Sequence, residues 1–110
     1  MFSIYVKEVQ KDSVKLRFES DGERTINIKN PSLYMNGELS YGVSMATVDF
    51  YKSEIVVINL ISLEYDCTKA DSLNFVAVDD ANRQYKVGIS MKAGAVANIE
   101  EIPDSVGNFR

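Results

Sequence analysis

Residues 13–19 have the sequence Ser13-Val-Lys-Leu-Arg-Phe-Glu19, in which polar and apolar side chains alternate without a break. A strand with one buried and one solvated face shows this period of two. Residues 2–7 alternate in the same way, and Lys11-Asp12 between the two stretches supplies a tight turn. Asp21-Gly22, followed by the apolar positions of 26–28, predicts a hairpin, because both turn residues tolerate positive φ. The first 29 residues are therefore predicted to form a three-stranded meander.

Asn30-Pro31 is predicted to end this meander, since proline has no N–H to donate to a strand ladder and restricts the residue before it. Residues 33–41 then favour a short hairpin or an aromatic-rich loop. Residues 43–51 alternate as a further strand, and Lys52-Ser53-Glu54 is expected to be a turn.

Residues 55–65, Ile55-Val-Val-Ile-Asn-Leu-Ile-Ser-Leu-Glu-Tyr65, are apolar on both faces and rich in β-branched side chains. This composition is typical of a central strand, so we expect the middle of the core here. Asn59 interrupts the run, and a buried amide needs hydrogen-bond partners. We expect Asn59 to mark a bulge or to be a satisfied core amide, with a binding role as the alternative.

A second hairpin is predicted from residues 73–78 and 85–91, which flank the polar turn 79–83. Gly88 within its second strand suggests a bulge or a bend. Residues 93–102 fit either a final strand or a short helix.

These elements predict one all-β domain over residues 1–110, an antiparallel β-sandwich or small barrel of about seven to eight strands, with one short C-terminal helix as an option. A chain of 110 residues, 45% of them hydrophobic, can bury one core by itself. Cys67 is the single cysteine, so no internal disulfide can form. The N-terminus has no basic segment followed by an apolar run, and no stretch has the ~18 apolar residues of a membrane span. We expect a cytoplasmic protein that does not enter a membrane.

The net charge of −4 comes from 12 basic and 16 acidic residues. Residues 1–52 carry seven of each sign, so the whole acidic excess lies in residues 53–110. Nucleic-acid binding is disfavoured, because phosphate affinity comes from Lys and Arg. A basic partner is favoured by charge complementarity, although mild acidity also serves solubility alone.

The composition argues against an enzyme. With no histidine, Ser-His and Cys-His nucleophiles and histidine metal ligands are excluded. Cys67 has Lys69 nearby, but a lone cysteine at a strand end is expected to be inert. Glycosidases use two carboxylates, and the acidic pairs are too ordinary on an acidic surface to indicate one. Neither a calcium loop nor a glycine-rich phosphate loop is present in the sequence, so we expect no metal and no cofactor.

Recognition of another protein is the remaining function. Tyrosine combines a large contact area with a polar tip and is common at interfaces. Strand ends or loops are expected at Tyr34, Tyr41, Tyr51 and Tyr65. For each of them, covering the rim of the core is an equal alternative to a binding role. Combined with the acidic groups of the second half, tyrosine would suit a basic, concave partner. The predicted partner-binding residues are Glu64, Tyr65, Asp66, Asp71, Asp79, Asp80, Glu100, Glu101 and Asp104.

A small acidic chain of this kind, with its carboxylates at Glu64, Asp66, Asp71, Asp79, Asp80, Glu100, Glu101 and Asp104, resembles the immunity proteins of bacterial contact-dependent growth inhibition and related toxin systems. The resemblance covers general character over the whole chain and no motif. It implies a monomer that neutralises a basic, nuclease-type toxin by stoichiometric binding. The alternative hypotheses are a phage or secretion component that assembles through strand edges, and a small-molecule carrier, which a barrel with an apolar cavity could support.

Overall fold

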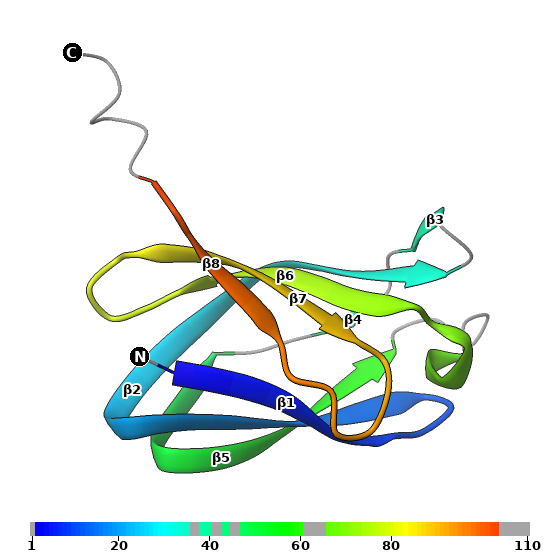
Figure 1. Cartoon of the computed structure of the whole chain (residues 1–110), viewed down its shortest axis with the longest axis horizontal. Coiled ribbons are helices and arrows are strands. Elements are labelled where there is room, and N and C mark those ends of the chain that lie inside the picture. The colour runs from blue at the N-terminus through cyan, green and yellow to red at the C-terminus, as the bar shows by residue number, and fades with distance from the viewer. Residues whose placement is uncertain (1, 36–37, 41–42, 45–46, 61–65, 104–110) are drawn as a thin grey trace.

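The computed structural model describes residues 2–35, 38–40, 43–44, 47–60 and 66–103. It confirms the all-β class: eight strands form one curled antiparallel sheet with the shape of a half-barrel (Figure 1). The bounds are β1 Phe2–Val9, β2 Ser13–Met35, β3 Glu38–Ser40, β4 Val43–Ser44, β5 Val48–Leu60, β6 Ser72–Val78, β7 Gln84–Ser90 and β8 Asn98–Ile102, with a 3-10 helix η1 at Cys67–Lys69. The strand order is β4-β5-β2-β6-β7-β8, with β1 and β3 also paired to β2. None of the helical residues in these ranges forms a segment long and apolar enough to cross a membrane.

The 23-residue strand β2 organises the sheet, because different partners pair with its two halves. Its first half lies between β1 and β5, and its second half pairs with β6 and, at its end, with β3. The sheet bends where the ladders shift register, between Glu19 and Glu23 and again between Lys29 and Ser32. This change of partners along one bent strand curls the sheet.

The hairpin turn predicted at Asp21-Gly22 and the strand end predicted at Asn30-Pro31 are both wrong. The backbone passes through Asp21-Gly22 and Asn30-Pro31 as parts of β2. A type I′ hairpin needs positive φ at both central residues, and neither Asp21 nor Gly22 has it. Ser20 instead hydrogen-bonds Gly22 through its hydroxyl, which holds the local bend. Asn30 adopts φ 53°, so Asn30-Pro31 is a bulge between two parts of one strand.

Residues 94–97 cover the edge of β1 that faces away from β2. Val6 donates to Ala95 O at 2.9 Å and accepts from Gly94 N at 2.8 Å, and Ala97 N donates to Ile4 O at 2.8 Å. The chain then continues into β8, which pairs with β7. Residues 98–102 are therefore a strand, and the alternative of a helix over 93–102 is wrong. The backbone of 94–102 instead pairs with β1 and then with β7.

The core lies on the concave side of the curled sheet. The alternation in β1 and β2 correctly predicts which of their side chains are buried there. Ile4, Leu16 and Phe18 are fully buried, and Val6 and Val14 almost so. From the other half of the sheet the core receives Leu33, Leu73, Phe75, Ala77, Tyr85, Val87 and Ile89. These side chains pack together as one buried cluster in the interior.

The expectation for residues 55–65 is wrong where the structure describes them. Val48–Leu60 is one continuous strand, so the predicted turn at 52–54 is absent and only a bend remains, at Lys52 with φ 69°. Ile58 is buried, but Ile55 and Val57 are 43% and 47% exposed, and Asn59 is exposed. β5 is therefore not the centre of the core, because the described residues leave the side chains of its outer face about half exposed.

The β6–β7 hairpin is confirmed, with its turn at 79–83. Its ladders pass through Gly88 without a register shift on either side, so the predicted bulge is absent. Gly88 lies opposite Asn74, and a Cβ there would come within 3.0 Å of Asn74 Oδ1. Close approach of this side chain therefore explains the glycine. The hairpin predicted for 33–41 is confirmed by the pairing of β2 with β3, whereas its Asn36-Gly37 turn lies outside the described residues.

Candidate functional site

The structure divides the predicted acidic residues between two ends of the sheet. Asp66 and Asp71 flank η1, where β6 begins, whereas Asp79 and Asp80 follow the end of β6 and lie beside Glu100 and Glu101 of β8. The seven residues of β6 separate the two groups by roughly 23 Å, at ~3.3 Å per residue. Figure 1 shows η1 and the 79–83 turn at opposite ends. Glu64, Tyr65 and Asp104 lie outside the described residues.

Asp66 is the N-cap of η1. Its Oδ1 accepts from the Thr68 backbone N–H at 2.9 Å and also from the Thr68 hydroxyl. The hydroxyl bond, and next the backbone bond, lowers the pKa of Asp66. Asp71 ties η1 to the end of β2, because its N–H donates to Tyr34 O at 2.7 Å. The Asp66 carboxylate therefore has a structural role in the loop, whereas this Asp71 contact uses the backbone.

Asp79 lies inside the molecule, with only 2% of its side chain exposed. Oδ1 accepts from Ala81 N at 3.0 Å and from Arg83 N at 2.9 Å, and Oδ2 accepts from the Tyr85 hydroxyl at 3.1 Å. Arg24 Nη1 lies 3.8 Å from the same Oδ2. Asp79 therefore closes the β6–β7 turn and anchors a buried polar cluster, and it does not belong to the exterior on which a partner was expected.

The polar cluster has two further properties. Burial, and next the hydrogen bond to Asp79, raises the pKa of Tyr85 above 10.0. The Arg24 guanidinium carbon lies 5.9 Å from the centre of the Phe2 ring, while its Nε is buried without a hydrogen-bond partner. Phe2 meets Tyr85 edge to face, with ring centres 5.3 Å apart. These contacts pack the β6–β7 turn against the start of β1.

Glu100 and Glu101 are exposed on opposite faces of β8, since neighbouring residues of a strand alternate. Glu100 lies opposite Lys86, and Glu101 lies opposite Tyr85. Beside them is an open hollow of about 500 Å³, lined by residues 81–84 and 101–103. Asp80 is exposed in the neighbouring turn. This end of the molecule thus combines acidic groups with Arg83 and Lys86, and the carboxylates do not form one acidic face.

Nothing in the described ranges suggests a nucleophile or a metal centre. Cys67 is buried, and this burial, and next the charge of Asp66, raises the pKa of its thiol. A raised pKa disfavours the thiolate that a nucleophilic cysteine needs. Residues 2–35, 38–40, 43–44, 47–60 and 66–103 contain no group of three side chains suited to hold a metal ion.

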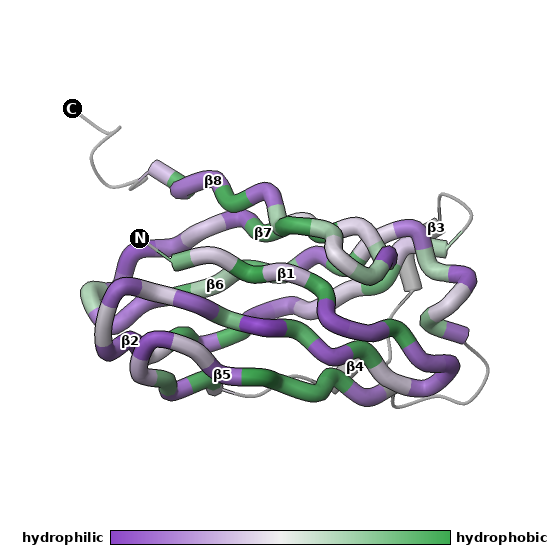
Figure 2. Tube along the Cα trace, turned by 60° about the horizontal axis from the view of Figure 1, so that its bottom comes forward, coloured by the Kyte–Doolittle hydropathy of each residue, from purple (hydrophilic) through white to green (hydrophobic). Residues whose placement is uncertain are grey.

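One surface of the molecule exposes hydrophobic side chains on a strand for which the sequence predicted burial. We call it the β5 surface: the exposed side chains of Tyr51, Ile55 and Val57 together with the adjoining strand edge from Val48 to Ile58. Tyr51 is 67% exposed. Figure 2 shows β5 at the margin of the sheet, with a run of hydrophobic residues along it. One edge of β5 pairs with β2 over nearly its whole length, and the described residues pair with the other edge only at Asn59 and Leu60, through β4.

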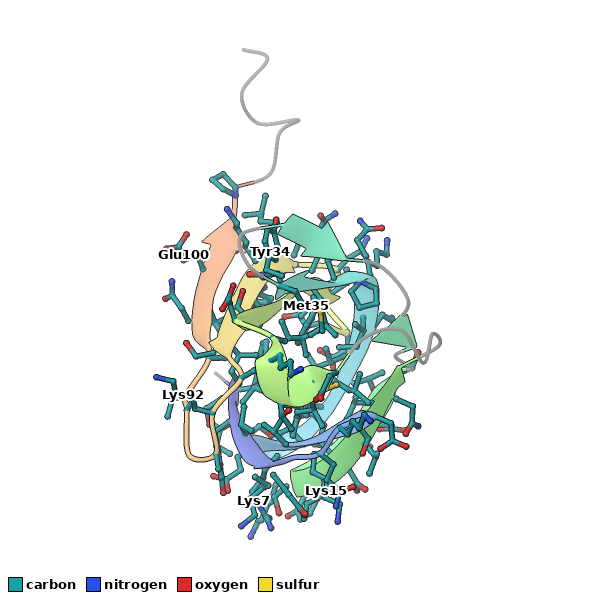
Figure 3. All side chains as sticks on the ribbon, turned by 90° about the vertical axis from the view of Figure 1, so that its right-hand side faces the viewer. Lys7, Lys15, Tyr34, Met35, Lys92 and Glu100 are labelled. Carbon is teal, nitrogen blue, oxygen red and sulfur yellow. The ribbon has the colours of Figure 1, made fainter. Side chains whose placement is uncertain are left out.

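Strand β2 places charges of both signs beside the β5 surface, with Glu19 opposite Ser53 and Glu23 opposite Tyr51. Arg17 lies opposite Ile55 and donates from Nη1 to Ser53 Oγ at 3.4 Å. Lys15 lies opposite Val57 and pairs with Glu8 at 3.3 Å. In Figure 3, Lys7 and Lys15 project on this side of the molecule, away from Glu100. The apolar run on both faces of residues 55–58 was the signal for this surface, and it predicted burial instead.

The tyrosines predicted as contact residues differ in their surroundings. Tyr51 is exposed on the β5 surface, and Tyr34 is 37% exposed at the other end of β2. Tyr34 lines a small hollow of about 180 Å³ with Asn74 and Lys86. Tyr41 and Tyr65 lie outside the described residues.

Comparison with known proteins adds no relative: no family model, no curated protein and no solved structure matches this chain.

Proposed function

We propose that this chain is a non-catalytic protein-binding module that contacts its partner through the β5 surface. The observation that supports this proposal is that β5 combines exposed apolar side chains with an edge from Val48 to Ile58 that the described residues leave unpaired. An open edge offers unpaired N–H and C=O groups to another strand. Apolar side chains beside it supply contact area once water is excluded.

Of the three functions left open by the sequence, which are toxin inhibition, assembly through strand edges and a small-molecule carrier, assembly has the best support. β5 has 13 residues, longer than an average strand, and its edge from Val48 to Ile58 could pair with another strand on both sides of the bend at Lys52. The charges that β2 places beside the β5 surface are of both signs, with Lys15 and Arg17 next to Glu19, so this surface is not the acidic face that a basic, nuclease-type toxin would need.

Toxin inhibition retains one supporting observation. Asp80 and Glu101 are exposed near the hollow of about 500 Å³ at the far end of the sheet. An immunity protein could use them to pair with Arg or Lys of a toxin. Titration of the toxin domain encoded by a neighbouring gene against the wild type and Asp80→Lys/Glu101→Lys would test this function. Binding that the double variant weakens supports it, and equal binding or none refutes it.

The test of the leading proposal is site-specific photo-crosslinking in the native cells. A benzoylphenylalanine replaces Ile55, at the centre of the β5 surface, and in the matched control it replaces Lys86, which is exposed on β7. We expect a discrete adduct from position 55 that position 86 does not give. Absence of any adduct at position 55, or equal adducts at both positions, would refute binding through β5.

A further inference from the structure

The chemistry of the β5 edge indicates which partner fits it. This inference rests on the proposed function and identifies the occupant of the same surface. All strand pairs in the sheet are antiparallel, and an antiparallel pair of two identical strands has two-fold symmetry. A second copy of this chain can therefore add its own β5 and continue the sheet without a new type of contact.

The charges along the edge select one register. Lys52 and Glu54 are exposed on either side of Ser53. A two-fold axis at Lys52 or at Glu54 would place that charge opposite itself, which is unfavourable. An axis further along the strand, at Ile55 or beyond, would place the charges against apolar residues. An axis at Ser53 places Lys52 of each copy opposite Glu54 of the other. It also places Asp49 opposite Val57, where Asp49 Oδ1 keeps the hydrogen bond that it accepts from Thr25 Oγ1 within its own chain.

The same register also matches the apolar side chains. With the axis at Ser53, Tyr51 of one copy lies opposite Ile55 of the other, and both are exposed in the single chain. The Lys52 ammonium lies 5.5 Å from the centre of the Tyr51 ring, so the charged and apolar contacts adjoin. The positive φ of Lys52 interrupts the extended backbone there. The main-chain hydrogen bonds of the pair would therefore come from the flanking residues.

We propose that two copies of this chain associate by antiparallel pairing of their β5 edges about a two-fold axis at Ser53. The first test is disulfide trapping. Ser53→Cys places two thiols opposite each other across the axis, with Cα atoms ~5 Å apart, within disulfide range. Ile55→Cys places its two thiols four residues apart, roughly 13 Å, which a disulfide cannot span. Cys67 is buried and gives little background.

We expect Ser53→Cys to form a covalent dimer under mild oxidation and Ile55→Cys to remain monomeric. Equal crosslinking of both variants, or none with Ser53→Cys, would overturn the register.

The second test is a charge exchange, measured as the dimer dissociation constant by sedimentation equilibrium. Lys52→Glu and Glu54→Lys each turn two attractive contacts into two repulsive ones, so each should weaken the dimer by ~10- to 100-fold. The double variant Lys52→Glu/Glu54→Lys restores opposite charges and should return to within about 3-fold of wild type. Lys92→Glu is the control, because it makes the same charge change at an exposed site away from β5.

Failure of the double variant to recover affinity, or an equal loss with Lys92→Glu, would overturn the proposal. A wild-type chain that stays monomeric at every concentration, yet gives an adduct with a different protein from position 55 in cells, would refute self-association while leaving the proposed function intact. Absence of any adduct from position 55 would refute both self-association and the proposed function.

Discussion

Replacement of Asp79 by alanine should be among the most destabilising single changes in this protein. The carboxylate accepts hydrogen bonds from two backbone N–H groups and from Tyr85, and it lies 3.8 Å from Arg24. Hydrogen bonds to a charged group contribute ~1.5–3 kcal/mol each, but they are not additive, and breaking a buried charge pair costs ~3–5 kcal/mol. Arg24 retains 20% exposure of its side chain, so water can partly compensate it. We expect a loss of about 4 kcal/mol in the free energy of unfolding.

Urea denaturation followed by circular dichroism would measure this loss, since the chain contains no tryptophan. Asp79→Asn separates the contributions, because the amide oxygen can still accept from Ala81 and Arg83 while the charge opposite Arg24 is lost. It should cost about 2 kcal/mol. Asp80→Ala is the matched control at the exposed neighbouring position and should change stability by less than ~0.5 kcal/mol. A loss below about 1 kcal/mol for Asp79→Ala would refute the structural role of the buried carboxylate.

Three further predictions concern pH, backbone and core. Burial raises the pKa of the Cys67 thiol above its ordinary 9.0, so the folded state favours the protonated form. The free energy of unfolding should therefore be at its full value below pH 9.0 and fall as the pH rises past it. Urea unfolding measured as a function of pH should show a smaller fall for Cys67→Ala. Gly94→Ala should cost ~1–2 kcal/mol because φ is 87°, whereas Gly22→Ala, with open space and no positive φ, should cost nothing or stabilise slightly; equal thermal shifts would contradict both assignments. Leu16→Ala should lower the free energy of unfolding by ~2–5 kcal/mol and Val57→Ala by less than ~1 kcal/mol in the same assay. A larger loss for Val57→Ala than for Leu16→Ala would show that β5 does belong to the centre of the core.

The class of the fold could be predicted because alternation is local. Val14, Leu16 and Phe18 had to share one face of any strand through them, and that face is buried. The β6–β7 hairpin could be predicted for the same reason, from two apolar runs around a polar turn. The β5 surface could not be predicted, because the exposure of Ile55 and Val57 depends on what packs over their strand. The structural role of Asp79 could not be predicted either. Asp79 and Asp80 are equivalent in sequence, yet only Asp79 is reached by Arg24, which is 55 positions earlier in the chain.

The amino-acid sequence by itself determined that this chain forms antiparallel strands and which side of most of them avoids water, since both follow from the spacing of neighbouring side chains. Only the tertiary structure decided that β2 continues through Asp21-Gly22, that residues 94–97 cover β1, and that β5 lies at a margin of the sheet. The physical reason is that the burial of an apolar strand depends on what packs against it. Ile55 and Val57 carry the side chains of a core strand, but the sheet places no layer over them.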